Sequence, residues 1–152
     1  MKERNIYVTV SSTILIFAGY LFKMNGYYQE GLLEGAEGLQ FTGKSILILI
    51  GVMAGANIVF NILGTIGFTI KDSVQNKDCK PGQLIEDERD KIIELKGMQV
   101  SYAVFGAGLI LSLIALTMGW AAPVVIIMII GSLVLAEIIG NIKKLFHYRR
   151  GF

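Results

Sequence analysis

Hydrophobic residues in this chain gather in four long runs, and charged residues fill the segments between them. The runs cover residues 6–22, 45–70, 98–120 and 124–142. A helix needs about 20 apolar residues to cross the hydrocarbon core of a bilayer, which is about 30 Å thick. The runs reach or approach this length, and Glu137 is the only charged residue inside them. The pattern therefore predicts four membrane-spanning helices.

We expect an all-α fold, an integral membrane four-helix bundle made of two antiparallel transmembrane hairpins. The chain has 152 residues, 53% of them hydrophobic, so no separate soluble domain fits once four spans are removed. Residues 1–152 are thus expected to form a single transmembrane domain with a cytoplasmic loop at 71–97. The first run is long for a signal peptide and no small-residue cleavage site follows it, which predicts a retained helix.

Lysine and arginine are distributed unevenly, and this distribution predicts the orientation. If the N-terminus is cytoplasmic, only Lys23 and Lys44 of the 14 lysines and arginines lie outside. Cytoplasmic segments of membrane proteins carry an excess of these residues. We therefore predict a multi-pass protein of the cell (inner) membrane with both termini in the cytoplasm. Its basic residues match an anionic inner leaflet, so direct nucleic-acid binding is not expected.

An intramembrane polar site is centred on Glu137. A carboxylate inside a span is costly and by default indicates a functional site. Asn61 and Thr65 of the second run and Tyr102 of the third lie at comparable depth, and Asn57 shares the helix face of Asn61. These side chains could line a proton or cation pathway. They could equally be structural, because intramembrane amides usually hydrogen-bond across helices.

Small residues suggest where the helices pack. Gly51 and Gly55 form a G-x-x-x-G pattern in the second run, and Gly108 and Ser112 lie on one line of the third. Small residues let helix backbones approach closely in lipid. The second run offers more of this surface than one hairpin partner needs, so we expect a homo-oligomer.

The loop before the third run carries a charged cluster of Glu86, Asp87, Glu88, Arg89 and Asp90. Acidic residues favour the start of a helix, and a solvated helix start is the simplest interpretation. A docking surface for a cytosolic regulatory protein is the main alternative. The spacing does not match a calcium-binding loop, His147 has no partner at ligand spacing, and a single cysteine excludes a cysteine-rich site. We expect no metal and no cofactor.

This cluster, followed by Ile92, Lys96 and Ser101-Tyr102, resembles a pattern in which a D-E-R-type helix enters a transmembrane hairpin. The pattern is similar to that of an uncharacterised family of small predicted four-helix prokaryotic membrane proteins, some of them encoded beside a helix-turn-helix regulator. The resemblance covers residues 84–148. It implies a cytosolic docking role for the segment 86–96 and carries no activity with it.

No nucleophile elbow, phosphate-binding loop or dinucleotide fingerprint is present in the sequence, so we expect no enzymatic activity. The leading hypothesis is a non-enzymatic membrane protein that acts through helix–helix oligomerisation or as the membrane anchor of a cytosolic partner. The alternative is a small proton- or cation-coupled transporter centred on Glu137.

Overall fold

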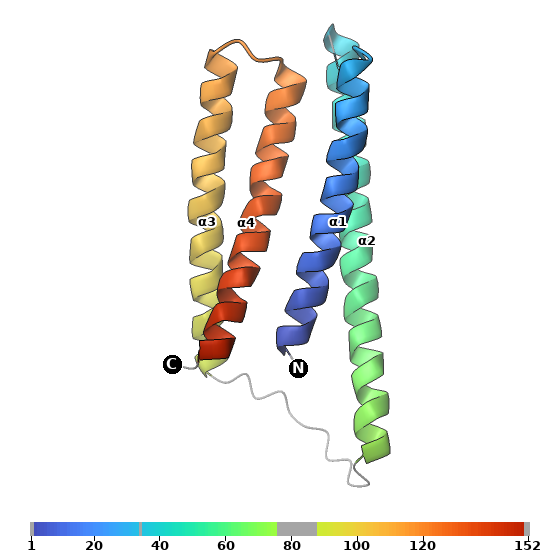
Figure 1. Cartoon of the computed structure of the whole chain (residues 1–152), viewed down its shortest axis with the longest axis vertical. Coiled ribbons are helices and arrows are strands. Elements are labelled where there is room, and N and C mark those ends of the chain that lie inside the picture. Colours follow the sequence, from blue (N-terminus) through green and yellow to red (C-terminus); the bar gives the residue numbers. More distant parts are fainter. Residues whose placement is uncertain (1, 34, 76–87, 151–152) are drawn as a thin grey trace.

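The protein is all-helical in the part of the chain that the computed structural model describes, residues 2–33, 35–75 and 88–150 (Figure 1). Four helices make up almost all of this part. Their bounds are α1 Lys2–Gln29, α2 Gly35–Gln75, α3 Glu88–Thr117 and α4 Ala122–Arg150. All four contain a stretch long and apolar enough to cross a membrane, which suggests a multi-pass membrane protein.

The helices extend beyond the apolar runs that predicted them. Within the expected loop 71–97, α2 continues to Gln75, whereas α3 begins at Glu88, inside the charged segment already interpreted as a helix start. Between them, residues 76–87 lie outside the described part of the chain. The reason for the difference is that apolar length reports the thickness of the hydrocarbon core, whereas backbone hydrogen bonds can continue a helix into the polar layers.

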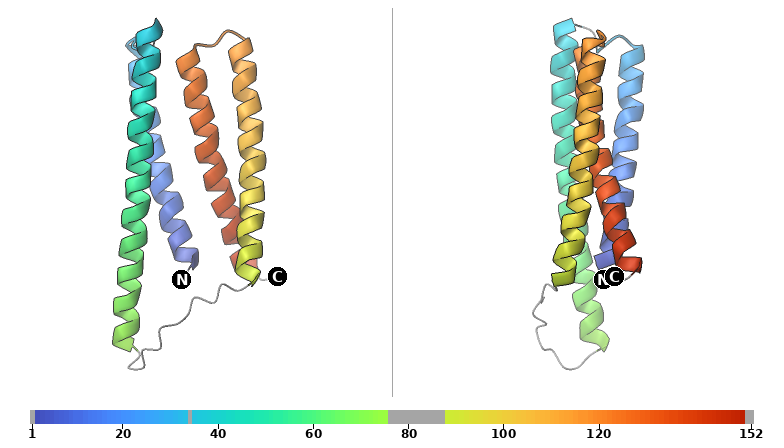
Figure 2. Two further views of the ribbon diagram at one scale, coloured as in Figure 1. Left: turned by 180° about the vertical axis from the view of Figure 1, so that it is seen from behind. Right: turned by 90° about the vertical axis from the view of Figure 1, so that its left-hand side faces the viewer.

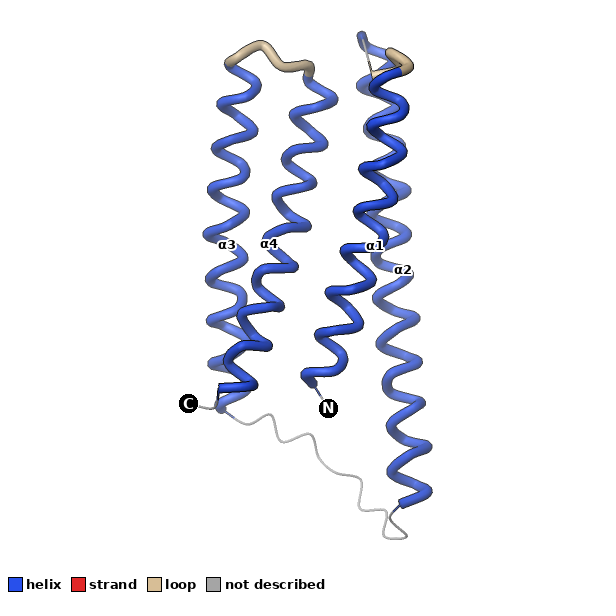
Figure 3. The backbone as a smooth tube through the Cα atoms, viewed as in Figure 1, coloured by secondary structure: helices blue, strands red, loops and turns tan. Residues whose placement is uncertain are grey.

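Short turns connect α1 to α2 and α3 to α4 (Figure 3), and α1 and α3 end with the same glycine-dependent geometry. At the end of α1, Leu32 N donates to Tyr27 O and Gly31 N donates to Tyr28 O, both at 3.1 Å. Gly31 has a φ of 72°, and Gly119 at the end of α3 has a φ of 84° with the equivalent pair of bonds. This is the Schellman arrangement, in which a left-handed residue satisfies the last carbonyls of a helix. These turns explain why both connections can be so short.

The helices form an open arrangement in which α1 and α4 occupy the middle (Figures 1 and 2). The closest packing is between α3 and α4, while α1 contacts both α4 and α2. The backbones of α2 and α3 are nowhere adjacent among the described residues. Both ends of the chain lie at the same end of the molecule, opposite the two short turns (Figure 1). Long faces of the two outer helices, α2 and α3, are therefore left uncovered.

A small apolar core joins the two helix pairs. Phe17 of α1, Leu49 of α2 and Val134 of α4 are buried together. Gly131 lies one turn from Val134 along α4, and a Cβ there would be 3.4 Å from the Phe17 ring. An added Cβ at Gly131 would thus make an ordinary van der Waals contact with the Phe17 ring.

Small residues line the contact between α3 and α4. The Ser101 hydroxyl donates to Ala136 O of α4 at 2.9 Å. A Cβ at Gly108 would collide with Ser132, and a Cβ at Gly140 would collide with Ser101. The two backbones can approach this closely only because these positions carry little or no side chain.

Candidate functional site

Glu137 lies on α4, directly after Ala136, whose carbonyl accepts the hydrogen bond from Ser101. Its side chain is half-buried. It therefore borders the α3–α4 contact within a helix that is long and apolar enough to cross a membrane.

The other residues of the predicted polar site lie on different parts of the molecule. Tyr102 is 70% exposed on α3. Asn57 is half-buried on α2 and already takes part in an interaction. The backbones of α2 and α3 are not adjacent in the described chain, so the structure does not bring Tyr102 to the α2 residues. The side chains of Asn61 and Thr65 lie outside the described part of the structure.

The predicted packing glycines occupy two different environments. Gly108 and Ser112 face inward on α3, where Gly108 meets Ser132 and the Ser112 hydroxyl donates to Gly108 O at 2.8 Å. Gly51 and Gly55 are exposed on α2, and a Cβ at either would meet no heavy atom within 4 Å. The G-x-x-x-G pattern of α2 thus makes no close contact with another helix among the described residues.

The charged cluster before the third span is only partly described. Glu86 and Asp87 lie outside the described residues, as does the side chain of Arg89. Glu88 is exposed at the start of α3. Asp90 accepts a hydrogen bond of 3.0 Å from the Tyr148 hydroxyl of α4. Asp90 therefore holds the ends of α3 and α4 together, a structural role that spacing alone did not indicate.

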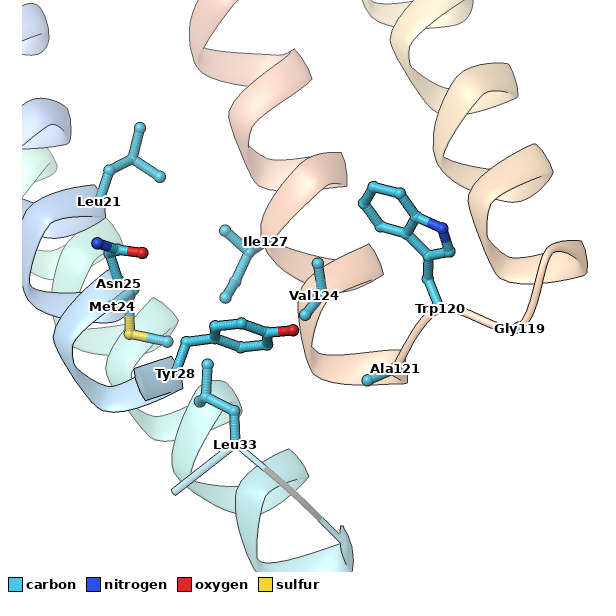
Figure 4. Close-up of a pocket in the computed structure, with 10 residues that line it drawn as sticks. All are labelled: Leu21, Met24, Asn25, Tyr28, Leu33, Gly119, Trp120, Ala121, Val124 and Ile127. Carbon is cyan, nitrogen blue, oxygen red and sulfur yellow. The ribbon is translucent and has the colours of Figure 1, made fainter. Parts of the chain in front are cut away.

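A cavity of about 640 Å³ lies at the end of the molecule opposite the chain termini, between α1, α4 and the α3–α4 turn (Figure 4). Asn25 and Tyr28 enter it from α1, and the Tyr28 ring extends toward Val124 of α4. Trp120 borders it from the turn. An amide and a phenol can orient an amphiphilic molecule, and Asn25 and Tyr28 are the described polar side chains of α1 that line this cavity.

Within the described residues, no group of three or more histidine, cysteine, aspartate or glutamate side chains could hold a metal ion. Sequence reasoning missed the cavity because its walls come from two distant stretches of the chain, residues 21–33 and 119–127, and only contacts between helices bring them together. The aromatic residues Tyr28 and Trp120 were the available signal, since such side chains gather at membrane interfaces.

No known protein family, curated protein or solved structure matches the chain. This result is consistent with membership of an uncharacterised family. The specific resemblance of the segment 86–96 to a D-E-R-type helix stays a prediction.

Proposed function

We propose that this chain is a non-enzymatic, multi-pass protein of the cell (inner) membrane, built of two antiparallel transmembrane hairpins, that acts by associating with further copies of itself. The observation that carries the proposal is the exposure of Gly51 and Gly55. Both lie on a long apolar helix with open space beside them. In lipid, such a pair allows a second helix to approach closely enough for extensive van der Waals contact.

The rest of the α2 surface is suited to the same environment. Leu47 is 70% exposed and Ile48 is 68% exposed, and large apolar side chains continue along the helix to Leu63. A contiguous apolar surface of this kind is unusual on a soluble monomer. Lipid tails and a second copy of α2 would together cover it.

The cytoplasmic end would serve as the anchor point for a regulatory partner. Glu88 is exposed at the start of α3, while Asp90 is held by Tyr148. The partner would therefore contact the exposed charges at the very start of α3, on a base made rigid by the Tyr148–Asp90 hydrogen bond.

The test is the molecular mass of the detergent-solubilised protein, measured by light scattering after size exclusion. We expect the wild type to be a dimer or larger and Gly55→Leu to shift it toward the monomer, because the new side chain blocks close backbone approach. Gly43→Leu is the matched control, since Gly43 is also exposed on α2 with open space beside it. A monomeric wild type, or an unchanged mass in Gly55→Leu, would contradict the proposal.

The alternative function is proton- or cation-coupled transport through Glu137. It is favoured by one observation, the half-buried position of this carboxyl inside a helix of membrane-spanning length. Carboxyl groups in spans often serve as proton relays. The two functions make opposite predictions for ion flux, as argued in the Discussion.

A further inference from the structure

A second hollow follows the contact between α1 and α2 on the surface of the molecule. Its volume is about 600 Å³. Apolar side chains such as Ile16 and Ile48 line its length, and Gly19 forms part of its wall. A Cβ at Gly19 would meet nothing within 4 Å, so the missing side chain widens the groove. We refer to this hollow as the α1–α2 groove.

One end of the α1–α2 groove is basic and polar. Lys23 of α1 and Lys44 of α2 both line it, and both are exposed. Between them and the apolar part, the Tyr20 hydroxyl and Ser45 Oγ lie 3.2 Å apart in a hydrogen bond that joins the two helices. Neither lysine forms an ion pair with a carboxylate of the described residues. An anion bound at this end of the groove would therefore lie beside two positive charges.

The two lysines also mark one boundary of the apolar spans. Lys23 directly follows the first hydrophobic run at 6–22, and Lys44 directly precedes the second at 45–70. In a bilayer they would lie at the headgroup level, while the apolar part of the groove would lie beside the acyl chains. Nearby, the Tyr27 ring packs edge-on against Phe41 with centroids 5.0 Å apart, and aromatic side chains favour the same level.

We propose that the α1–α2 groove is a binding site for an anionic phospholipid of the leaflet that faces Lys23 and Lys44. The phosphate would lie between the two ammonium groups, with the Tyr20–Ser45 pair beneath it. One acyl chain would follow the groove past Gly19 and Ile48. The proposal rests on the membrane location proposed above, and it is independent of self-association through Gly55.

Charge recognition is tested by titrating the detergent-solubilised full chain with phosphatidylglycerol and, separately, phosphatidylcholine, with bound lipid counted by native mass spectrometry. We expect tighter binding of phosphatidylglycerol. The double variant Lys23→Gln/Lys44→Gln should weaken its tightest site by roughly 30-fold, about 5-fold for each lysine. The control variant Lys2→Gln/Lys91→Gln removes two charges near the opposite end of the molecule. It should change the affinity of this site for phosphatidylglycerol little. Equal binding of the two lipids, or equal losses in the two double variants, would overturn the proposal.

The path of the acyl chain is tested with Gly19→Leu, which fills the groove without changing charge. We expect phosphatidylglycerol binding to fall at least about 10-fold, which corresponds to the loss of roughly two buried methylene groups. Gly43→Leu is the control, because Gly43 lies next to Lys44 and does not line the groove. If Gly19→Leu instead lowers the oligomeric mass and leaves lipid binding unchanged, a second copy occupies the groove and the lipid proposal is wrong. Circular dichroism of each variant confirms that the helices are retained.

Discussion

At the scale of single residues, the same amino acid has different consequences on different helix faces. Gly108 and Gly140 lie where α3 and α4 meet, and a methyl group at either would collide with a serine of the other helix. Gly51 and Gly55 face open space. Glycine costs helix stability relative to alanine when it has no packing role. The proposed self-association would give Gly51 and Gly55 the packing role that they lack among the described residues.

Glu137 allows a residue-scale prediction that separates the two proposed functions. If the protein acts by self-association, proteoliposomes should show no proton or cation flux above that of empty liposomes, and Glu137→Gln should leave the thermal stability nearly unchanged. Glutamine has the same shape and retains a hydrogen-bonding oxygen. If Glu137 instead carries protons or cations, the wild type should show flux and Glu137→Gln should abolish it. The exposed carboxylate of Glu94 provides the control variant Glu94→Gln, which should behave as wild type in both cases.

At the scale of elements, two glycines within a single turn of α3 should respond differently to substitution, because only one of them packs against α4. Gly108→Ala should destabilise the protein by about 1–3 kcal/mol, because the added methyl group overpacks against Ser132 and forces the helices apart. Gly106→Ala, two residues away, meets nothing within 4 Å and should be neutral or slightly stabilising. Thermal unfolding of both variants in detergent measures the difference. Equal melting temperatures for the two variants would show that close packing at Gly108 is not required.

The four helices could be predicted from the sequence because apolar length is a strong signal in a membrane protein. Their neighbours could not be predicted in the same way. Tyr102 and the α2 amides lie at comparable depth along their helices. Depth alone does not indicate which helices are neighbours, and the backbones of α2 and α3 are not adjacent among the described residues. The face of α3 that contacts α4 was easier to predict, because Gly108 and Ser112 lie on one line along that helix. The role of Asp90 depends on Tyr148, 58 residues away, and no local pattern contains that information.

At the scale of the whole molecule, the open arrangement leaves the outer faces of α2 and α3 uncovered by the other described helices. A closed bundle would have buried them against each other. The central helices α1 and α4 also contact each other at the end with the chain termini. There the guanidinium carbon of Arg149 lies 5.8 Å from the centre of the Tyr7 ring. Among the described side chains, Lys91, Lys96, Lys143, Lys144 and Arg149 lie toward this end, and Lys23 and Lys44 lie toward the other. In the proposed orientation, the end with more basic residues would face an anionic cytoplasmic leaflet.

Topology is the last prediction, and it concerns the chain as a whole. We expect both termini in the cytoplasm, because only Lys23 and Lys44 would then lie outside. Single cysteines introduced at Gly35, Lys77 and Arg150 in a Cys79→Ser background report the side of each segment. A membrane-impermeant maleimide added to intact cells should label position 35, at the start of α2, and should reach positions 77 and 150 only after permeabilisation. Labelling of position 77 in intact cells would show that the orientation is the opposite of the predicted one. The phospholipid proposed at Lys23 and Lys44 would then belong to the inner leaflet.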